Sequence, residues 1–170
     1  MTPHTNSFKV LGSFISSRLC TPLGHVSFWA YIILAIVLFG AAGIWVELVR
    51  LLLKANASEF EGILTAIYTY FPAIAVGAAV QLIMDRPPKP VASFTMVWVV
   101  FSLVLVIPYS VGLVQPDDAL RLGVVGSVMA FLMWWVANGA NPSYLDSSPE
   151  DTLGATPTSE PAGDTSNFTV

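Results

Sequence analysis

Charged side chains are scarce in this chain. They make up 11% of its 170 residues, whereas 55% of the residues are hydrophobic and the mean hydropathy is +0.70. Soluble globular domains carry about 25% charged residues. Because this chain has less than half of that share, it cannot cover its surface with groups that face water. The shortage therefore indicates a protein whose surface faces lipid.

Cysteine and histidine are nearly absent. The single cysteine, Cys20, excludes an intramolecular disulfide, and the two histidines, His4 and His25, belong to no cluster with metal-ligand spacing. There is no glycine-rich loop between a strand and a helix, and no nucleophile has a base near it in the sequence. We therefore expect no enzyme, no metal site and no cofactor.

Basic residues are also few, at seven against eleven acids, for a net charge of −4. Five of the acids lie near the C-terminus, where no Lys or Arg accompanies them; these are Asp146, Glu150, Asp151, Glu160 and Asp164. Since no part of the chain forms a strongly basic patch, nucleic-acid binding is not expected.

Long apolar runs dominate what the sequence does contain. They cover residues 25–53, 62–84, 91–114 and 119–140. Each reaches the ~20 residues that a helix needs to cross a hydrocarbon core. The loops between them are short, which favours antiparallel neighbours. We predict an all-α membrane protein with four transmembrane helices in an up-down antiparallel bundle, at about 26–53, 59–85, 91–114 and 117–140.

Both ends of the chain differ from this core. On a helix, residues 1–24 place Phe8, Val10, Leu11, Phe14, Ile15 and Leu19 on one side. This pattern predicts an amphipathic interfacial helix, with the Arg18 stem reaching toward the headgroups; a partly ordered terminus is the alternative. Residues 142–170 are rich in Ser, Thr, Pro and acids and predict a disordered acidic tail. The domains are thus 1–24, 25–141 and 142–170.

Helix boundaries carry their own signals. Ser58 and Glu61 form a capping box that starts the second helix.

Four basic residues, Lys9, Arg18, Arg86 and Lys89, lie on the N-terminal side of the bundle, against three on the other side. This bias predicts that both termini are cytoplasmic and that the chain is integral to a plasma or inner membrane.

The stretch GIWVELVRLLLK, residues 43–54, places a carboxylate near the end of the first helix. Its face contains residues at spacings of three and four: Gly40, Gly43, Glu47, Arg50 and Lys54. Glu47 could bind a cation or carry a proton inside the membrane. However, residues 26–46 are long enough to span the core, and Trp45 marks an aromatic belt, which places Glu47 at the interface. Small multidrug transporters are similar in having four helices and a carboxylate in the first, but theirs lies well inside the helix.

Small residues predict where helices meet. They are Ala73 and Gly77 with Gln81 in the second helix, and Gly123 with Ser127 and Gly126 with Ala130 in the fourth. These faces serve contacts within one chain or in a homo-oligomer.

Pro72 and Pro108 predict kinks in the second and third helices.

Two functions follow from these features. The first is a small membrane subunit that oligomerises and recruits soluble partners at the cytoplasmic side through its termini, such as a membrane effector of a multi-component, for example bacterial defence, system. The alternative is a channel or ion-coupled transporter whose path is lined by Glu47, Gln81 and Pro72. The subunit is favoured because few polar groups lie within the hydrocarbon, where a transporter keeps its site.

Overall fold

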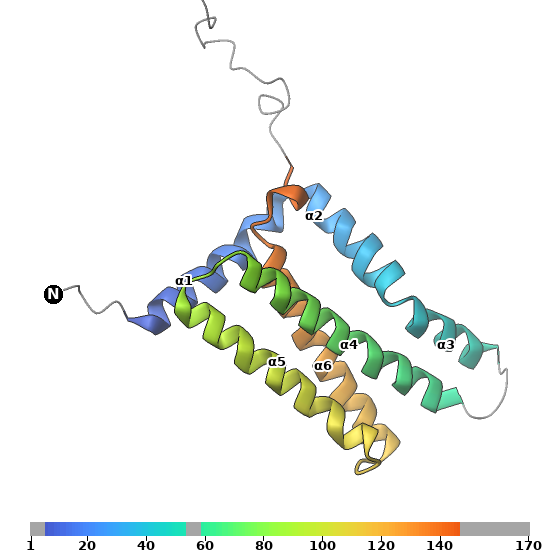
Figure 1. The fold of residues 1–170 in the computed structure, drawn as a ribbon. Helices are drawn as coiled ribbons and strands as arrows, with labels where there is room; N and C mark the ends of the chain where they lie inside the picture. The colour runs from blue at the N-terminus through green and yellow to red at the C-terminus, as the bar shows by residue number, and fades with distance from the viewer. Residues whose placement is uncertain (1–5, 54–58, 147–170) are drawn as a thin grey trace, which may run out of the picture.

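The computed structural model describes residues 6–53 and 59–146, and these residues are helical with no strand among them (Figure 1). The elements are α1 (Ser7–Cys20), the 3₁₀ turn η1 (Thr21–Gly24), α2 (Val26–Tyr31), the π-helical segment η2 (Ile32–Gly40), α3 (Ala42–Leu52), α4 (Glu59–Met84), α5 (Lys89–Ser110), α6 (Pro116–Asn138) and the 3₁₀ turn η3 (Pro142–Tyr144). The predicted all-α class is thereby confirmed.

Three helices are long and apolar enough to cross a membrane. They cover Glu61–Met84, Lys89–Ser110 and Pro116–Asn138. By length and composition, the pair Ser7–Gly24 and Val26–Gly40, which meet at 95°, adds up to one further span. Within the described ranges, the structure confirms the prediction of several helices that are long and apolar enough to span a membrane.

The first predicted helix, 26–53, is not a single regular helix. It is π-helical from Ile32 to Gly40 and breaks at Ala41, where φ is −88° and ψ is 16°. Side chains donate to two backbone carbonyls beside the break. The Ile36 carbonyl accepts from the Ala41 N–H (3.2 Å) and the Tyr70 hydroxyl (2.9 Å). The Val37 carbonyl accepts from the Trp45 indole N–H (2.7 Å), so this ring is tied to the break and is not only a belt residue.

Helix α4 occupies the centre and packs against α3, α5 and α6, while α1 crosses the end of the bundle where α4 and α6 finish and α5 begins (Figure 1). We call this the α1 end. The opposite end, with the end of α3, the start of α4 and the α5–α6 turn, is the far end. Two buried apolar clusters follow this arrangement, one around Phe28, Leu82 and Trp134 near the α1 end and one around Leu64 and Phe71 farther along.

The most extensive helix contact is that of α4 with α6, and small residues of α6 make it possible. A Cβ at Gly123 would come within 2.7 Å of Ile67, and one at Gly126 within 2.9 Å of the Phe71 ring. Ala130 is also buried on this face. Glycine and alanine at these positions therefore let large side chains of α4 lie directly against the α6 backbone. Nearby, the Ser127 hydroxyl donates to the Gly123 carbonyl at 2.8 Å.

The other small-residue face, on α4, is not used in the same way. Ala73 and Gly77 are exposed, and a Cβ at Gly77 would meet no atom within 4 Å. Gln81 on the same face is half-buried. Both α4 and α5 continue as helices through Pro72 and Pro108, and the kinks expected there stay predictions. The first helix is interrupted at Ala41, a position without a proline.

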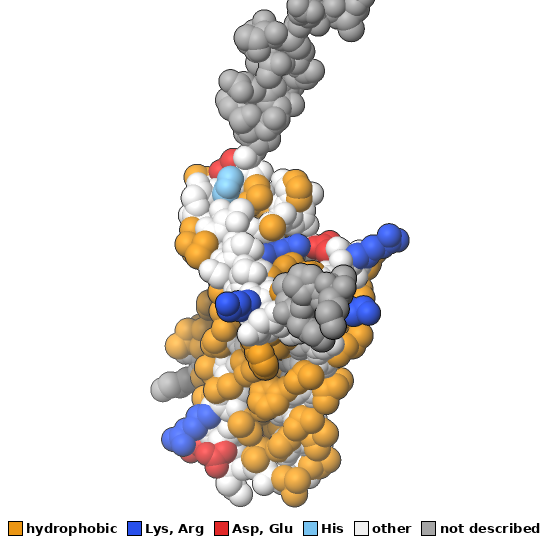
Figure 2. Space-filling view, turned by 90° about the vertical axis from the view of Figure 1, so that its left-hand side faces the viewer, with side chains coloured by type: hydrophobic (Ala, Val, Ile, Leu, Met, Phe, Trp, Pro, Cys, Tyr) orange, Lys and Arg blue, Asp and Glu red, His pale blue; other side chains and the backbone are white. Residues whose placement is uncertain are grey.

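The surface is divided into charged ends and an apolar middle. Figure 2 shows basic side chains gathered at the level of α1, a continuous hydrophobic area below them, and charged groups again at the lower end. Helix α5 contributes much of the apolar area, with Met96, Val97 and Val100 more than half exposed. A surface of this kind suits hydrocarbon on its middle part and water at its two ends.

Candidate functional site

Glu47 lies in the contact between α3 and α4. Its carboxylate rests directly over Gly62, where a Cβ would overlap Glu47 Oε2 and lie 2.9 Å from Cδ. One turn further from the far end, Gly43 faces Ala66: a Cβ added to Gly43 would lie 3.8 Å from the Ala66 Cβ. Gly40, a further turn along, faces Tyr70, and a Cβ added there would lie 3.3 Å from the Tyr70 ring. The glycine and carboxylate face predicted from the sequence is therefore the face of the first helix that touches α4.

Arg50 neutralises this carboxylate from the same helix. Its Nη1 donates to Glu47 Oε1 at 2.7 Å, and the Arg50 side chain is 61% exposed while that of Glu47 is 21% exposed. Gly62 belongs to the beginning of α4, at the end of the bundle that also holds Glu61, Asp117 and Asp118. An ion pair in this position has one partner in contact with polar surroundings, which lowers the cost of burying the other.

The structure does not bring Glu47 and Gln81 together. Glu47 lies at Gly62, near the start of α4, whereas Gln81 lies in its last turns, about 28 Å away along the helix axis. Among the described residues, the buried polar side chains are Thr95, Ser102 and Asn138, and each donates to a carbonyl of its own helix. These groups do not form a connected polar path.

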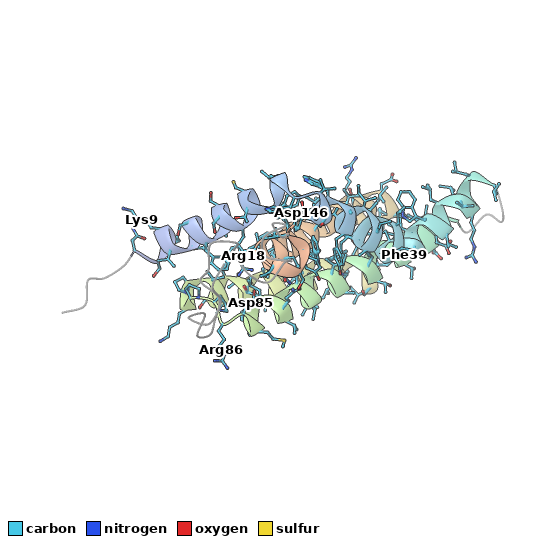
Figure 3. All side chains as sticks on the ribbon, turned by 90° about the horizontal axis from the view of Figure 1, so that it is seen from above. Lys9, Arg18, Phe39, Asp85, Arg86 and Asp146 are labelled. Carbon is cyan, nitrogen blue, oxygen red and sulfur yellow. The ribbon has the colours of Figure 1, made fainter. Side chains whose placement is uncertain are left out.

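Arg18 is the group at the α1 end that the sequence did not single out for this role. Its Nη1 donates to the Ala137 carbonyl at 2.7 Å and to Asp85 Oδ2 at 3.2 Å, and its guanidinium lies 4.8 Å from the centre of the Phe14 ring. Figure 3 shows Arg18 and Asp85 pointing toward one another. The side chain is only 15% exposed. It therefore joins α1 to the ends of α4 and α6, and the predicted extension toward headgroups is replaced by these internal bonds.

Gly139 makes the same junction compact. A Cβ on this residue would overlap the Arg18 carbonyl oxygen. Its φ of −65° is open to any residue, so the requirement for glycine comes from space and not from backbone conformation.

Asp146 fastens the segment after α6 to the start of α2. Its carboxylate accepts from the Val26 N–H at 2.8 Å and the Ser27 N–H at 3.1 Å, while its own N–H donates to His25 Nδ1 at 3.0 Å. Hydrogen bonds from the Ser27 side chain, then from the Ser27 and Val26 backbone, with the nearby His25, lower the pKa of Asp146. A carboxylate distant in sequence thus caps α2.

An aromatic cluster supports this connection. Phe28 and Tyr31 of α2 stack on Trp134 of α6, with ring centroids 5.8 and 5.7 Å apart, and Tyr144 of η3 lies 4.3 Å from Tyr31. Residues 142–146, which the sequence places in the disordered tail, therefore belong to the folded part. The remaining tail, 147–170, lies outside the described residues, as do Ser58 of the capping box and Lys54.

The predicted residues thus form three groups in space. Gly40, Gly43, Glu47 and Arg50 lie at the α3–α4 contact, Gly123, Gly126, Ser127 and Ala130 lie at or beside the α4–α6 contact, and Ala73 and Gly77 face outward. The α1 end, held by Arg18 and Asp146, is the feature that sequence reasoning missed, because its bonds join residues more than sixty positions apart. Comparison with protein-family models, curated protein sequences and solved structures finds no match to this chain.

Proposed function

We propose that the chain is a four-span membrane subunit that self-associates and presents α1 and its C-terminal tail to soluble partners at the cytoplasmic face. The observation that supports this most directly is the position of α1. Its partly buried residues, which include Leu11, Phe14, Ile15 and Leu19, face the bundle, whereas Lys9 and its serines face outward. An amphipathic helix in this position lies in the plane of the interface and exposes a polar surface.

The path of the first helix supports four spans. Segments α2, η2 and α3 follow one another along the side of the bundle for roughly 40 Å, which is enough to cross the hydrocarbon. On this reading α1 is the interfacial helix, and the 95° bend is the point where the chain turns into the membrane. Four spans place both termini on one side, and Ser7 and Asp146 both lie near the α1 end (Figure 1).

The arrangement of polar groups favours a subunit over a transporter. A transporter keeps a polar site near the middle of the membrane. Here Glu47 is paired with Arg50 near the far end, and the buried hydroxyls of Thr95 and Ser102 bond within their own helix. In the described part of the chain, the transporter alternative therefore lacks a path between Glu47 and Gln81, two of the three residues proposed to line it.

Reconstitution tests the choice. We expect proteoliposomes with the full chain to show no proton, sodium or potassium flux above protein-free vesicles, and Glu47→Gln to leave that result unchanged. A flux in the wild type that disappears in Glu47→Gln but persists in Arg121→Gln would establish the transporter instead.

Self-association has its own test on the exposed α4 face. Measured by energy transfer between labelled chains in lipid, association should weaken in Ala73→Leu/Gly77→Leu, because the larger side chains prevent close approach of a second helix. Val97→Leu on exposed α5 serves as the control. Equal transfer in wild type and double variant would exclude this face as the interface.

A further inference from the structure

A cavity of about 130 Å³ lies beneath α1. Ile15 and Leu19 of α1 line it together with Phe94 and Trp98 of α5 and Leu132 and Val136 of α6, and every lining side chain is apolar. Cavities of about this size with such walls stay dry and admit small hydrocarbons. Its natural content is therefore hydrocarbon and not water.

The cavity adjoins the apolar middle of the surface. Leu132, in its wall, is 41% exposed, and Val97, next to Trp98 on α5, is 67% exposed. These side chains lie on helices that are apolar enough to span a membrane. A lipid chain that lies along α5 and α6 can thus reach the cavity without crossing a polar surface.

Cations surround the same end of the molecule. Arg86 and Lys89 lie in and just after the α4–α5 turn, and Lys89 precedes the cavity residue Val91 by less than one helical turn. The nearest acid, Asp85, is already held by Arg18 at 3.2 Å. Within 6–53 and 59–146, Arg86 and Lys89 have no carboxylate at ion-pair distance. Figure 3 shows Arg86 pointing away from the bundle.

We propose that the α1 end binds one anionic phospholipid, with an acyl chain in the cavity beneath α1 and the phosphate headgroup against Arg86 and Lys89. The cavity supplies the apolar contact, and the two cations select negative charge. This site requires that the chain be embedded in a membrane, but it does not depend on self-association or on partner recruitment.

Lipid selectivity tests the headgroup. We expect native mass spectrometry of the full chain to retain phosphatidylglycerol in preference to phosphatidylcholine of the same acyl chains. Arg86→Gln/Lys89→Gln should reduce that preference by about fivefold for each cation removed. Arg121→Gln, which removes an exposed cation at the far end, should leave it unchanged. Equal retention of both lipids by the wild type, or the same loss of preference in Arg121→Gln as in Arg86→Gln/Lys89→Gln, would overturn the proposal.

Trp98 reports on the acyl chain. Its ring lines the cavity, so phosphatidylglycerol with brominated chains should quench its fluorescence more than brominated phosphatidylcholine does, and Trp98→Phe should abolish the difference. Val136→Phe, which fills the cavity, should also abolish it, whereas Val128→Phe, exposed on the same helix, should not. If Val136→Phe does not fold, the comparison of wild type with Trp98→Phe still decides. A difference that survives in Trp98→Phe would mean that lipids only surround the protein.

Discussion

Three single residues at the α1 end make contacts between helices that their positions in the sequence do not predict. Arg18, Gly139 and Asp146 each lie in a segment that reads as peripheral, yet each contacts a helix far away in the chain. They stabilise this end through close packing and through hydrogen bonds to backbone groups. A substitution that changes only the packing, or only the hydrogen bonds, can therefore measure each contribution separately.

Gly139→Ala isolates the space requirement. The added Cβ would overlap the Arg18 carbonyl oxygen, so α1 has to move away from α6. We expect a loss of about 1–3 kcal/mol in the free energy of unfolding, measured by thermal or denaturant unfolding in detergent. The control is Gly77→Ala, which has no atom within 4 Å of its new Cβ and should be neutral or stabilising by up to about 1 kcal/mol. Equal effects of the two changes would contradict the close contact.

The contact of the Asp146 carboxylate with the Val26 and Ser27 N–H groups depends on the charge of the carboxylate. Hydrogen bonds from Ser27 and Val26 lower its pKa from the ordinary value of 3.8. A carboxyl group with a lowered folded-state pKa stabilises the attachment fully above pH 3.8, and this stabilisation is lost as the pH falls through the lower folded value. The Val26 and Ser27 amide NMR signals should therefore titrate with a midpoint below 3.8. In Asp146→Asn this titration should be absent; a midpoint at or above 3.8 would show that the carboxylate is not bonded.

At the scale of elements, the break in the first helix is held by side chains of other segments. The Tyr70 hydroxyl, from α4, and the Trp45 indole, from α3, donate to carbonyls of η2 close to the break. Removing one bond should loosen η2 locally, because the carbonyl then lacks its side-chain donor in an apolar region.

Tyr70→Phe tests this support. We expect a loss of about 0.5–1.5 kcal/mol in stability, together with faster amide hydrogen exchange from Ile36 to Ala41 and unchanged exchange in α6. Tyr109→Phe is the matched control, since its hydroxyl pairs with Thr65 on an exposed part of α4. Faster exchange across the whole molecule in Tyr70→Phe would mean that the bond supports the bundle and not the break.

The elements also mark what a sequence of this kind can and cannot predict. Helix type and approximate bounds follow from the long apolar runs, because this signal is local. The α4–α6 contact was visible as Gly123, Gly126 and Ala130, since small residues at helical spacing specify a face. The break at Ala41 could not be predicted, because no proline or other local signal marks this position, and the Tyr70 and Trp45 bonds beside it form only in the folded chain.

At the scale of the whole molecule, two observations point to the same orientation. The α1 end has Lys9, Arg18, Arg86 and Lys89 against the described acids Asp85 and Asp146, whereas the far end has Arg50 and Arg121 against Glu47, Glu61, Asp117 and Asp118. An excess of Lys and Arg on one side favours that side as cytoplasmic. Because Asp85 pairs with Arg18, this pair adds no net charge. Lys9, Arg86 and Lys89 then stand against Asp146 alone among the described acids of the α1 end, which is still an excess of cations.

The single cysteine makes this orientation directly testable. Cys20 is exposed at the last residue of α1, so a membrane-impermeant maleimide reports the side of α1 in the native chain. We expect no labelling in intact cells and full labelling after permeabilisation. In the matched chain Cys20→Ser/Asp117→Cys, whose thiol is at the far end, labelling should be complete in intact cells. Labelling of both thiols from the same side would contradict the four-span arrangement, because three spans, namely α2 to α3, α4 and α5, lie between the two positions in that arrangement. A simple exchange of the two results would keep the four spans and reverse the orientation.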